Sequence, residues 1–206
     1  MREKDIILTA KVISVLFTPF YLPLVGLLVL FLFSYMGMLF PWSYKLIVLI
    51  LVYLFTILLP TVMIYAYRRY HGWTLIELGN RKRRMVPYII SMISYYCCVY
   101  VMQRLHMPHF MSCIVIAGLM VQILCALVNV WWKISTHMAA IGGVAGALMA
   151  FAELFSFNPV WWLSLLFILS GILGSSRLIL RQHTLLQVVV GFFLGVFCGM
   201  ISILFL

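Results

Sequence analysis

The sequence predicts an all-α, polytopic membrane helix bundle, and three observations lead to this expectation. Hydrophobic residues make up 66% of the 206 residues and charged residues only 9%, which is too apolar for one water-soluble core. The apolar runs are continuous rather than alternating, which favours membrane helices over the strands of a barrel. The connections between the runs are short, and we therefore expect a single membrane domain over residues 1–206.

The apolar runs predict six to seven transmembrane helices, because crossing the hydrocarbon layer takes roughly 20 helical residues. We expect them near residues 21–39, 44–67, 87–103, 110–132, 138–155, 160–173 and 184–206. Residues 6–20 are interrupted by Lys11 and closed by Thr18-Pro19, which predicts a separate interfacial or re-entrant helix. No small-residue cleavage site follows the charged N-terminus, so we expect the first span to remain in the mature protein.

The polar residues are predicted to gather on one side of the membrane. The connections after the second, fourth and sixth spans share a side, and they carry the polar stretches 68–84, 133–137 and 175–183. The turns on the other side, near 40–43, 105–109 and 156–159, are nearly bare of charge. Any chemistry on a charged substrate is therefore expected at the first of these two sides.

The shortage of carboxylates makes a metal site or a metal cofactor an unfavourable prediction. Mg²⁺ and Ca²⁺ sites are built largely from clustered carboxylates. The chain has only Glu3, Asp5, Glu77 and Glu153, of which the first two alone are neighbours. The five cysteines all fall inside apolar runs and are predicted to be small buried hydrophobes.

Three motifs lie on the polar side. Ser176-Arg177 is followed after five residues by His183 and then by Gln187, Ser135-Thr136-His137 precedes the fifth span, and the stretch 80–87 combines arginines with Pro87. These motifs resemble those of the type 2 phosphatidic acid phosphatases, which are Ser-Arg-x5-His-x3-Asp, Pro-Ser-Gly-His and Lys-x6-Arg-Pro. Gln187 replaces the aspartate of the first pattern, Ser135-Thr136-His137 is similar to the end of the second, and the stretch 80–87 matches the third only loosely. The resemblance implies a helical core of that family in residues 68–206, preceded by N-terminal helices in residues 1–67.

The resemblance also implies a role for each site residue. His183 would be the nucleophile that takes the phosphoryl group, while His137 would protonate the leaving alkoxide and then activate water. Gln187 would orient His183 through its amide oxygen. The remaining candidates would bind phosphate, because arginine grips phosphate bidentately and a helix start offers free backbone amides: Arg177, Ser135, Thr136, Arg81 and Arg84.

The leading prediction is therefore a metal-independent membrane lipid phosphatase that acts on a lipid phosphomonoester or diphosphate, without a cofactor and without nucleic acid. The open alternative is a catalytically weakened relative that binds anionic lipid, serves as a scaffold or transports a substrate. Twelve of the fourteen Lys and Arg residues lie on the motif side, with Lys45 and Arg104 opposite. The positive-inside rule then favours a cytoplasmic site, in what we expect to be a bacterial inner membrane, whereas the family resemblance implies the outer face of that membrane.

Residues outside the motifs have structural interpretations. Lys133 and Arg181 are predicted to be membrane-interface anchors. Gln122 and Asn129, seven residues apart in one apolar run, are predicted to make interhelical hydrogen bonds. Two sets of small residues are predicted to let the last helix pack closely against a neighbour: Gly142, Gly143, Gly146, Gly191, Gly195 and Gly199.

Overall fold

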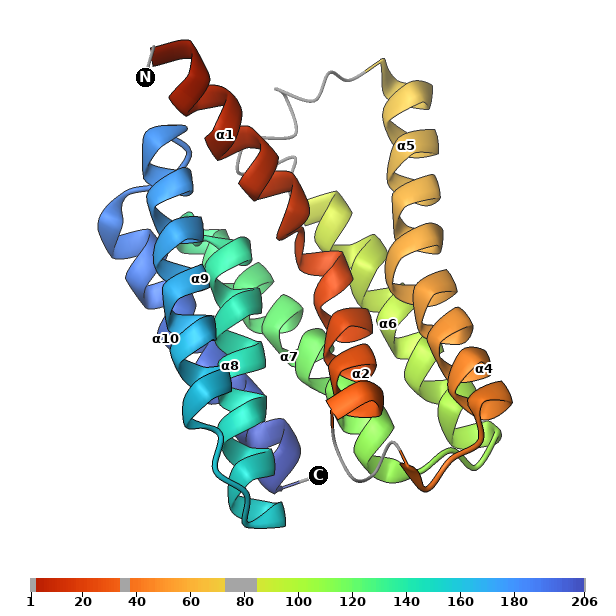
Figure 1. The fold of residues 1–206 in the computed structure, drawn as a ribbon. Coiled ribbons are helices and arrows are strands. Elements are labelled where there is room, and N and C mark those ends of the chain that lie inside the picture. The colour runs from red at the N-terminus through yellow and green to blue at the C-terminus, as the bar shows by residue number, and fades with distance from the viewer. Residues whose placement is uncertain (1–2, 34–37, 73–84, 206) are drawn as a thin grey trace.

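The computed structural model describes residues 3–33, 38–72 and 85–205, and throughout these residues the regular elements are helices (Figure 1). The predicted all-α class is confirmed. The α-helices are α1 (Glu3–Leu16), α2 (Leu22–Phe33), α4 (Trp42–Tyr53), α5 (Leu59–His71), α6 (Met85–Arg104), α7 (His109–Trp131), α8 (Thr136–Phe155), α9 (Val160–Ile179) and α10 (Leu185–Leu204). A 3₁₀ turn, η1 (Pro19–Tyr21), joins α1 to α2, and a π-helical turn, η2 (Leu54–Leu58), joins α4 to α5.

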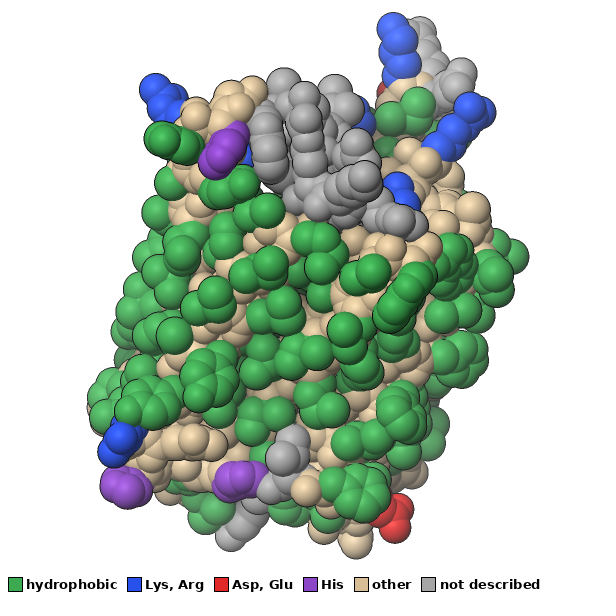
Figure 2. Space-filling view, turned by 180° about the vertical axis from the view of Figure 1, so that it is seen from behind, with side chains coloured by type: hydrophobic (Ala, Val, Ile, Leu, Met, Phe, Trp, Pro, Cys, Tyr) green, Lys and Arg blue, Asp and Glu red, His purple; other side chains and the backbone are tan. Residues whose placement is uncertain are grey.

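Seven helical stretches in the described residues are long and apolar enough to cross a membrane. They are Lys4–Leu32, Trp42–His71, Met85–Arg104, His109–Trp131, Thr136–Phe155, Val160–Ile179 and Leu185–Leu204. The protein is a multi-pass membrane protein. Figure 2 shows a largely hydrophobic surface between the two ends of the bundle, with most of the visible Lys and Arg side chains at one end.

The N-terminal segment differs from the sequence-based prediction. Residues 6–20 do not form a separate re-entrant helix, because α1 passes through η1 and runs on into α2 toward the other end of the bundle (Figure 1). Thr18 adopts an extended conformation with φ −61° and ψ 133°, and Pro19 then starts the 3₁₀ turn. Proline fits the first position of a helix, so Thr18-Pro19 bends the first span without ending it.

The sixth span is longer than predicted, which places Arg177 inside a helix. We expected this span to end near residue 173, but α9 continues to Ile179. The hydroxyls of Ser175 and Ser176 donate to carbonyl oxygens one turn earlier, each at 2.8 Å. Their polar groups are thus satisfied within the helix, and the apolar-to-polar change in sequence does not end it.

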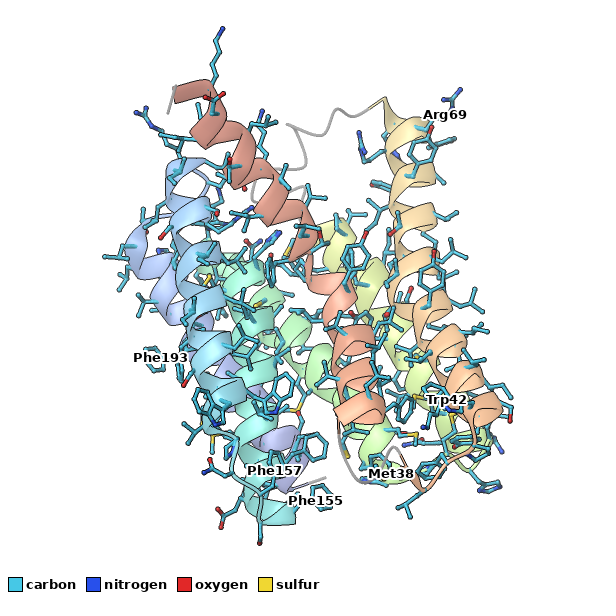
Figure 3. All side chains as sticks on the ribbon, viewed as in Figure 1. Met38, Trp42, Arg69, Phe155, Phe157 and Phe193 are labelled. Atoms are coloured by element: carbon cyan, nitrogen blue, oxygen red, sulfur yellow. The ribbon has the colours of Figure 1, made fainter. Side chains whose placement is uncertain are left out.

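The predicted sidedness of the connections is confirmed. Figure 1 places the end of α5, the start of α8 and the α9–α10 turn at the end of the bundle where the N-terminus lies. The α6–α7 turn, the α8–α9 turn and the C-terminus lie at the other end. Figure 3 shows Arg69 at the first end, Trp42 and Phe157 at the second, and Phe193 pointing outward between them.

The glycine stripes bring α8 and α10 into close contact, as predicted. A Cβ atom at Gly142 or Gly146 would collide with a carbonyl oxygen of α10, and one at Gly195 or Gly199 would collide with a carbonyl oxygen of α8. The two backbones therefore lie nearer to each other than side chains normally permit. This pair fixes the starts of α8 and α10, which carry the motif residues, relative to each other. In α7, Asn129 makes the expected interhelical contact, its Nδ2 lying 3.7 Å from the sulfur of Met85 in α6.

Candidate functional site

His183 lies in the turn between α9 and α10, and Gln187 holds its imidazole ring. The His183 side chain is only 7% exposed, and its Nδ1 lies 3.1 Å from Oε1 of Gln187. The same Oε1 accepts a hydrogen bond from the backbone N–H of Thr184 at 3.3 Å. Because a backbone N–H can only donate, the atom that faces it must be the amide oxygen of Gln187. That oxygen can only accept, so Nδ1 of His183 carries a proton and the lone pair of the neutral ring is on Nε2.

A capping box explains why the sequence folds in this way at the start of α10. Thr184 is the N-cap, its hydroxyl accepts from the backbone N–H of Gln187 at 3.4 Å, and Gln187 reciprocates through Oε1. The pattern Thr-x-x-Gln is one of the sequence signatures of such a box. Gln187 therefore has two functions, because one amide oxygen both caps the helix and orients His183.

The preceding helix ends in a Schellman turn that reverses the chain toward His183. The N–H of Gln182 donates to the carbonyl of Arg177 at 3.2 Å, and the N–H of Arg181 donates to that of Leu178 at 2.9 Å. Arg181 has φ +51°, the left-handed conformation in which glycine is usual. A residue with a side chain pays roughly 1 kcal/mol or more for this conformation.

Arg177 and His137 meet at a residue of α1 that the sequence did not single out. Nη1 of Arg177 donates to the hydroxyl of Ser14, and Nε2 of His137 donates to the backbone carbonyl of Ser14 at 3.1 Å. Arg177 is 5% exposed, and Ser14 is also buried. Since the carbonyl can only accept, the neutral His137 ring has its proton on Nε2 and its lone pair on Nδ1.

Ser135 contacts the start of α10 through its backbone, but its side chain does not make the capping hydrogen bond that its residue type favours. It is the N-cap of α8, which begins at Thr136 rather than near Met138, and its hydroxyl makes no capping bond. Its backbone N–H donates to the carbonyl of Gln187 at 3.4 Å. The hydroxyl of Ser135 is buried, with no hydrogen-bond partner among the described residues.

A surface pocket of about 430 Å³ lies beside His183. Its lining comes from the α7–α8 connection, the α9–α10 turn and the first turn of α10: Lys133, Leu178, Arg181, Gln182, His183, Thr184 and Gln187. Arg177 and His137 are not part of this lining. The predicted site residues thus form two groups. His183 and Gln187 belong to the pocket, while Arg177 and His137 contact Ser14. The turn that follows Arg177 in the chain connects the second group to the first.

Sequence reasoning missed three residues of these groups. Ser14 was not considered, although it is a polar residue in an apolar stretch, and Lys133 and Arg181 were interpreted mainly as interface anchors. The two cations stand two residues before Ser135 and His183 respectively, and this spacing is a signal that could have indicated the pocket. Arg81, Arg84 and Glu77 lie outside the described residues.

A second hollow, of about 500 Å³, follows the membrane-facing side of α9 beneath α1. It is almost entirely apolar, and it reaches Ser175 and Ser176, next to Arg177. A Cβ added at Gly171, in the wall of this groove, would meet no atom within 4 Å. The groove therefore runs from the apolar middle of the bundle to its polar end.

Within the described part of the chain, no group of three or more His, Cys, Asp or Glu side chains is placed to hold a metal ion. In comparisons with known proteins, no protein-family model matches this chain. No curated protein and no solved structure matches it significantly either.

Proposed function

We propose that this protein is a membrane lipid phosphatase of the type 2 phosphatidic acid phosphatase kind, which hydrolyses a lipid phosphomonoester or diphosphate through a phosphohistidine at His183. The observation that carries the proposal is the His183–Gln187 contact. It keeps the neutral ring in the tautomer whose lone pair is on Nε2, the nitrogen that would act as the nucleophile. The Lys133 and Arg181 side chains flank the same pocket and favour an anionic substrate there.

In the proposed reaction, the Nε2 lone pair of His183 attacks phosphorus while the bond from phosphorus to the lipid oxygen breaks. In this step His137 acts as the doubly protonated ring: the leaving oxygen takes its Nδ1 proton while Nε2–H stays on the Ser14 carbonyl, and the released lipid alcohol departs. Water then gives a proton to Nδ1 of His137 and attacks the phosphohistidine, which releases inorganic phosphate and restores Nε2 of His183. The family resemblance gives Arg177 the role of stabilising charge on the phosphoryl oxygens in both steps; in this structure its Nη1 donates to Ser14 and it does not line the His183 pocket, so in this role it would have to turn toward the bound phosphoryl group.

The α1–α9 groove supports a lipid as the substrate rather than a soluble phosphate ester. Its apolar wall suits a hydrocarbon chain, and toward the polar end of the bundle it is lined by Ser175 and Ser176, which precede Arg177 in the sequence. The charge bias supports placing the head group on the cytoplasmic side of a bacterial inner membrane.

The geometry around His137 favours a second candidate, a catalytically weakened relative that binds or moves anionic lipid or acts as a scaffold. Nε2 of His137 is engaged by the Ser14 carbonyl, so only the doubly protonated ring could donate a proton from Nδ1 to a leaving group. Nε2 of His183 is itself buried, and Gln187 gives no charge to stabilise an imidazolium.

Phosphate release by the purified protein separates the two candidates. The substrates are phosphatidic acid, phosphatidylglycerophosphate and a polyprenyl diphosphate, each in EDTA, with His183→Ala as the inactive control. The proposal expects release in EDTA from at least one substrate and none from the control. Release that persists in His183→Ala, or no release from any substrate, would favour the second candidate or another mechanism.

A further inference from the structure

The pocket beside His183 contains more positive charge than the motifs account for. Arg177 donates to Ser14 beneath α1 and does not line the pocket. Two other cations do line it, Lys133 before α8 and Arg181 after α9. Among the described residues, the lining contains two cations and no Asp or Glu side chain. This part of the lining therefore favours an anion.

The number of charges matches a phosphate group. A phosphomonoester carries about −1.5 to −2 charges at neutral pH. Lys133 and Arg181, which both line the hollow, supply two positive charges, and Gln182, Thr184 and Gln187 add polar lining. A guanidinium and an ammonium in the lining of one hollow can neutralise such a group.

The left-handed conformation of Arg181 does not by itself mark it as functional. His106 has the same φ of +51°, and it ends α6 with the same pair of backbone bonds, from Met107 to Met102 and from His106 to Gln103. Ser156, at the end of α8, also has a positive φ, of +49°. Arg181 differs in its location. His106 is in the α6–α7 turn and Ser156 is in the α8–α9 turn, and both turns lie at the other end of the bundle from the α9–α10 turn (Figure 1). His106 is thus a geometric twin of Arg181 outside the pocket.

We propose that Arg181, assisted by Lys133, binds the phosphate group of the substrate in the His183 pocket, and so acts as a second phosphate clamp besides Arg177. This inference rests on the proposed function for the identity of the substrate. The side chain of Arg181 is exposed and makes no hydrogen bond to another described residue. It can therefore turn toward an anion without breaking a contact within the described part of the protein.

The test is a binding titration that does not depend on turnover. Purified protein in detergent is titrated with orthovanadate and, separately, with inorganic phosphate, by isothermal titration calorimetry. Arg181→Gly should weaken both affinities roughly ten- to a hundred-fold, the usual effect of losing a charge-assisted contact. The same variant should raise Tm by roughly 2–4 °C, because glycine relieves the left-handed strain.

His106→Gly is the matched control, since it relieves the same strain at the other end of the molecule. It should raise Tm in the same way and leave both anion affinities unchanged. Arg181→Lys, which keeps the charge, should retain most of the affinity. Unchanged affinity in Arg181→Gly would overturn the inference, and so would the absence of anion binding by the wild-type protein.

Two further outcomes separate this inference from its alternatives. If Arg181→Gly weakens only the association of the protein with phosphatidylglycerol vesicles, Arg181 is an interface anchor and the inference is wrong. If the anions bind through Arg181 but no lipid phosphate is hydrolysed, the clamp stands while the proposed function fails. Binding and phosphate release therefore test the two proposals separately.

Discussion

Replacing Gln187 by glutamate tests the orientation of His183 without moving it. Glutamate has the length of glutamine, so a carboxylate oxygen can take the place of Oε1, 3.1 Å from Nδ1 of His183 and 3.3 Å from the N–H of Thr184. The capping box is preserved, because glutamate is a usual residue at this position. A carboxylate in the first turn of α10 also interacts favourably with the helix dipole, by roughly 0.3–1 kcal/mol.

The size of the expected effect follows from the charge that forms on the ring. As Nε2 bonds to phosphorus, the imidazole of His183 becomes cationic, and a carboxylate stabilises this cation more than an amide does. The reverse change, Asp to Asn in a serine protease triad, lowers turnover about 10⁴-fold, and that loss comes largely from the wrong tautomer of the histidine. Because Gln187 already holds His183 in the required tautomer, only the charge effect remains, and we expect Gln187→Glu to raise kcat about tenfold.

The assay is phosphate release under saturating substrate, accompanied by a thermal unfolding measurement. Gln187→Asp is the geometric control, since its shorter side chain would not reach both Nδ1 and the N–H of Thr184. It should raise kcat less than Gln187→Glu or lower it, and it should also lower Tm. A folded Gln187→Glu protein with unchanged or reduced kcat would refute the reasoning that charge on this residue limits the chemistry.

Three more predictions concern packing, the α1 contact and topology. Gly195→Ala should lower the free energy of unfolding by about 1–3 kcal/mol, because its Cβ would collide with the Ala139 carbonyl. Gly171→Ala, whose Cβ meets no atom, should raise it by up to about 1 kcal/mol. Equal effects of the two substitutions in thermal unfolding would contradict the α8–α10 packing. Ser14→Ala should cost about 1.5–3 kcal/mol, since the Arg177 guanidinium loses an acceptor, and an unchanged Tm would argue against that bond. In a cysteine-free background, a cysteine at Asn158 should react in intact cells with a membrane-impermeant thiol reagent and one at Gln182 should not; the reverse pattern would place the site outside.

The elements that sequence predicted well depend on local spacing. The spans follow from the length of apolar runs, and the close α8–α10 packing follows from glycines four residues apart, such as Gly191, Gly195 and Gly199. The contact of His183 with Gln187 also follows from spacing, because residues four apart face each other at a helix start.

The elements that sequence predicted poorly depend on contacts between distant segments. The bend at Thr18-Pro19 sets the direction of α1, which packs against α9. In this position Ser14 contacts His137 and Arg177, which are more than 120 residues away in the chain. No periodicity in the sequence encodes the tilt of α1. The hydroxyl of Ser135 likewise fails to cap α8, although its residue type favours a capping role.

The two cations of the pocket were identified only from the structure. Lys133 and Arg181 stand near membrane boundaries, where positive residues are expected for topological reasons. Their convergence around His183 depends on the Schellman turn at Arg181 and on the short α7–α8 connection. Both features are set by backbone geometry rather than by residue type.

Trapping of a phosphoenzyme tests the central proposal most directly. Wild-type protein is mixed in EDTA with a lipid phosphate that carries ³²P in its phosphate group, quenched in alkali within the first turnover and digested. We expect an acid-labile, base-stable phosphate on the peptide that contains His183, and no label in His183→Ala. Phosphate release without such a label, or a label that persists in His183→Ala, would contradict a phosphohistidine mechanism at this residue.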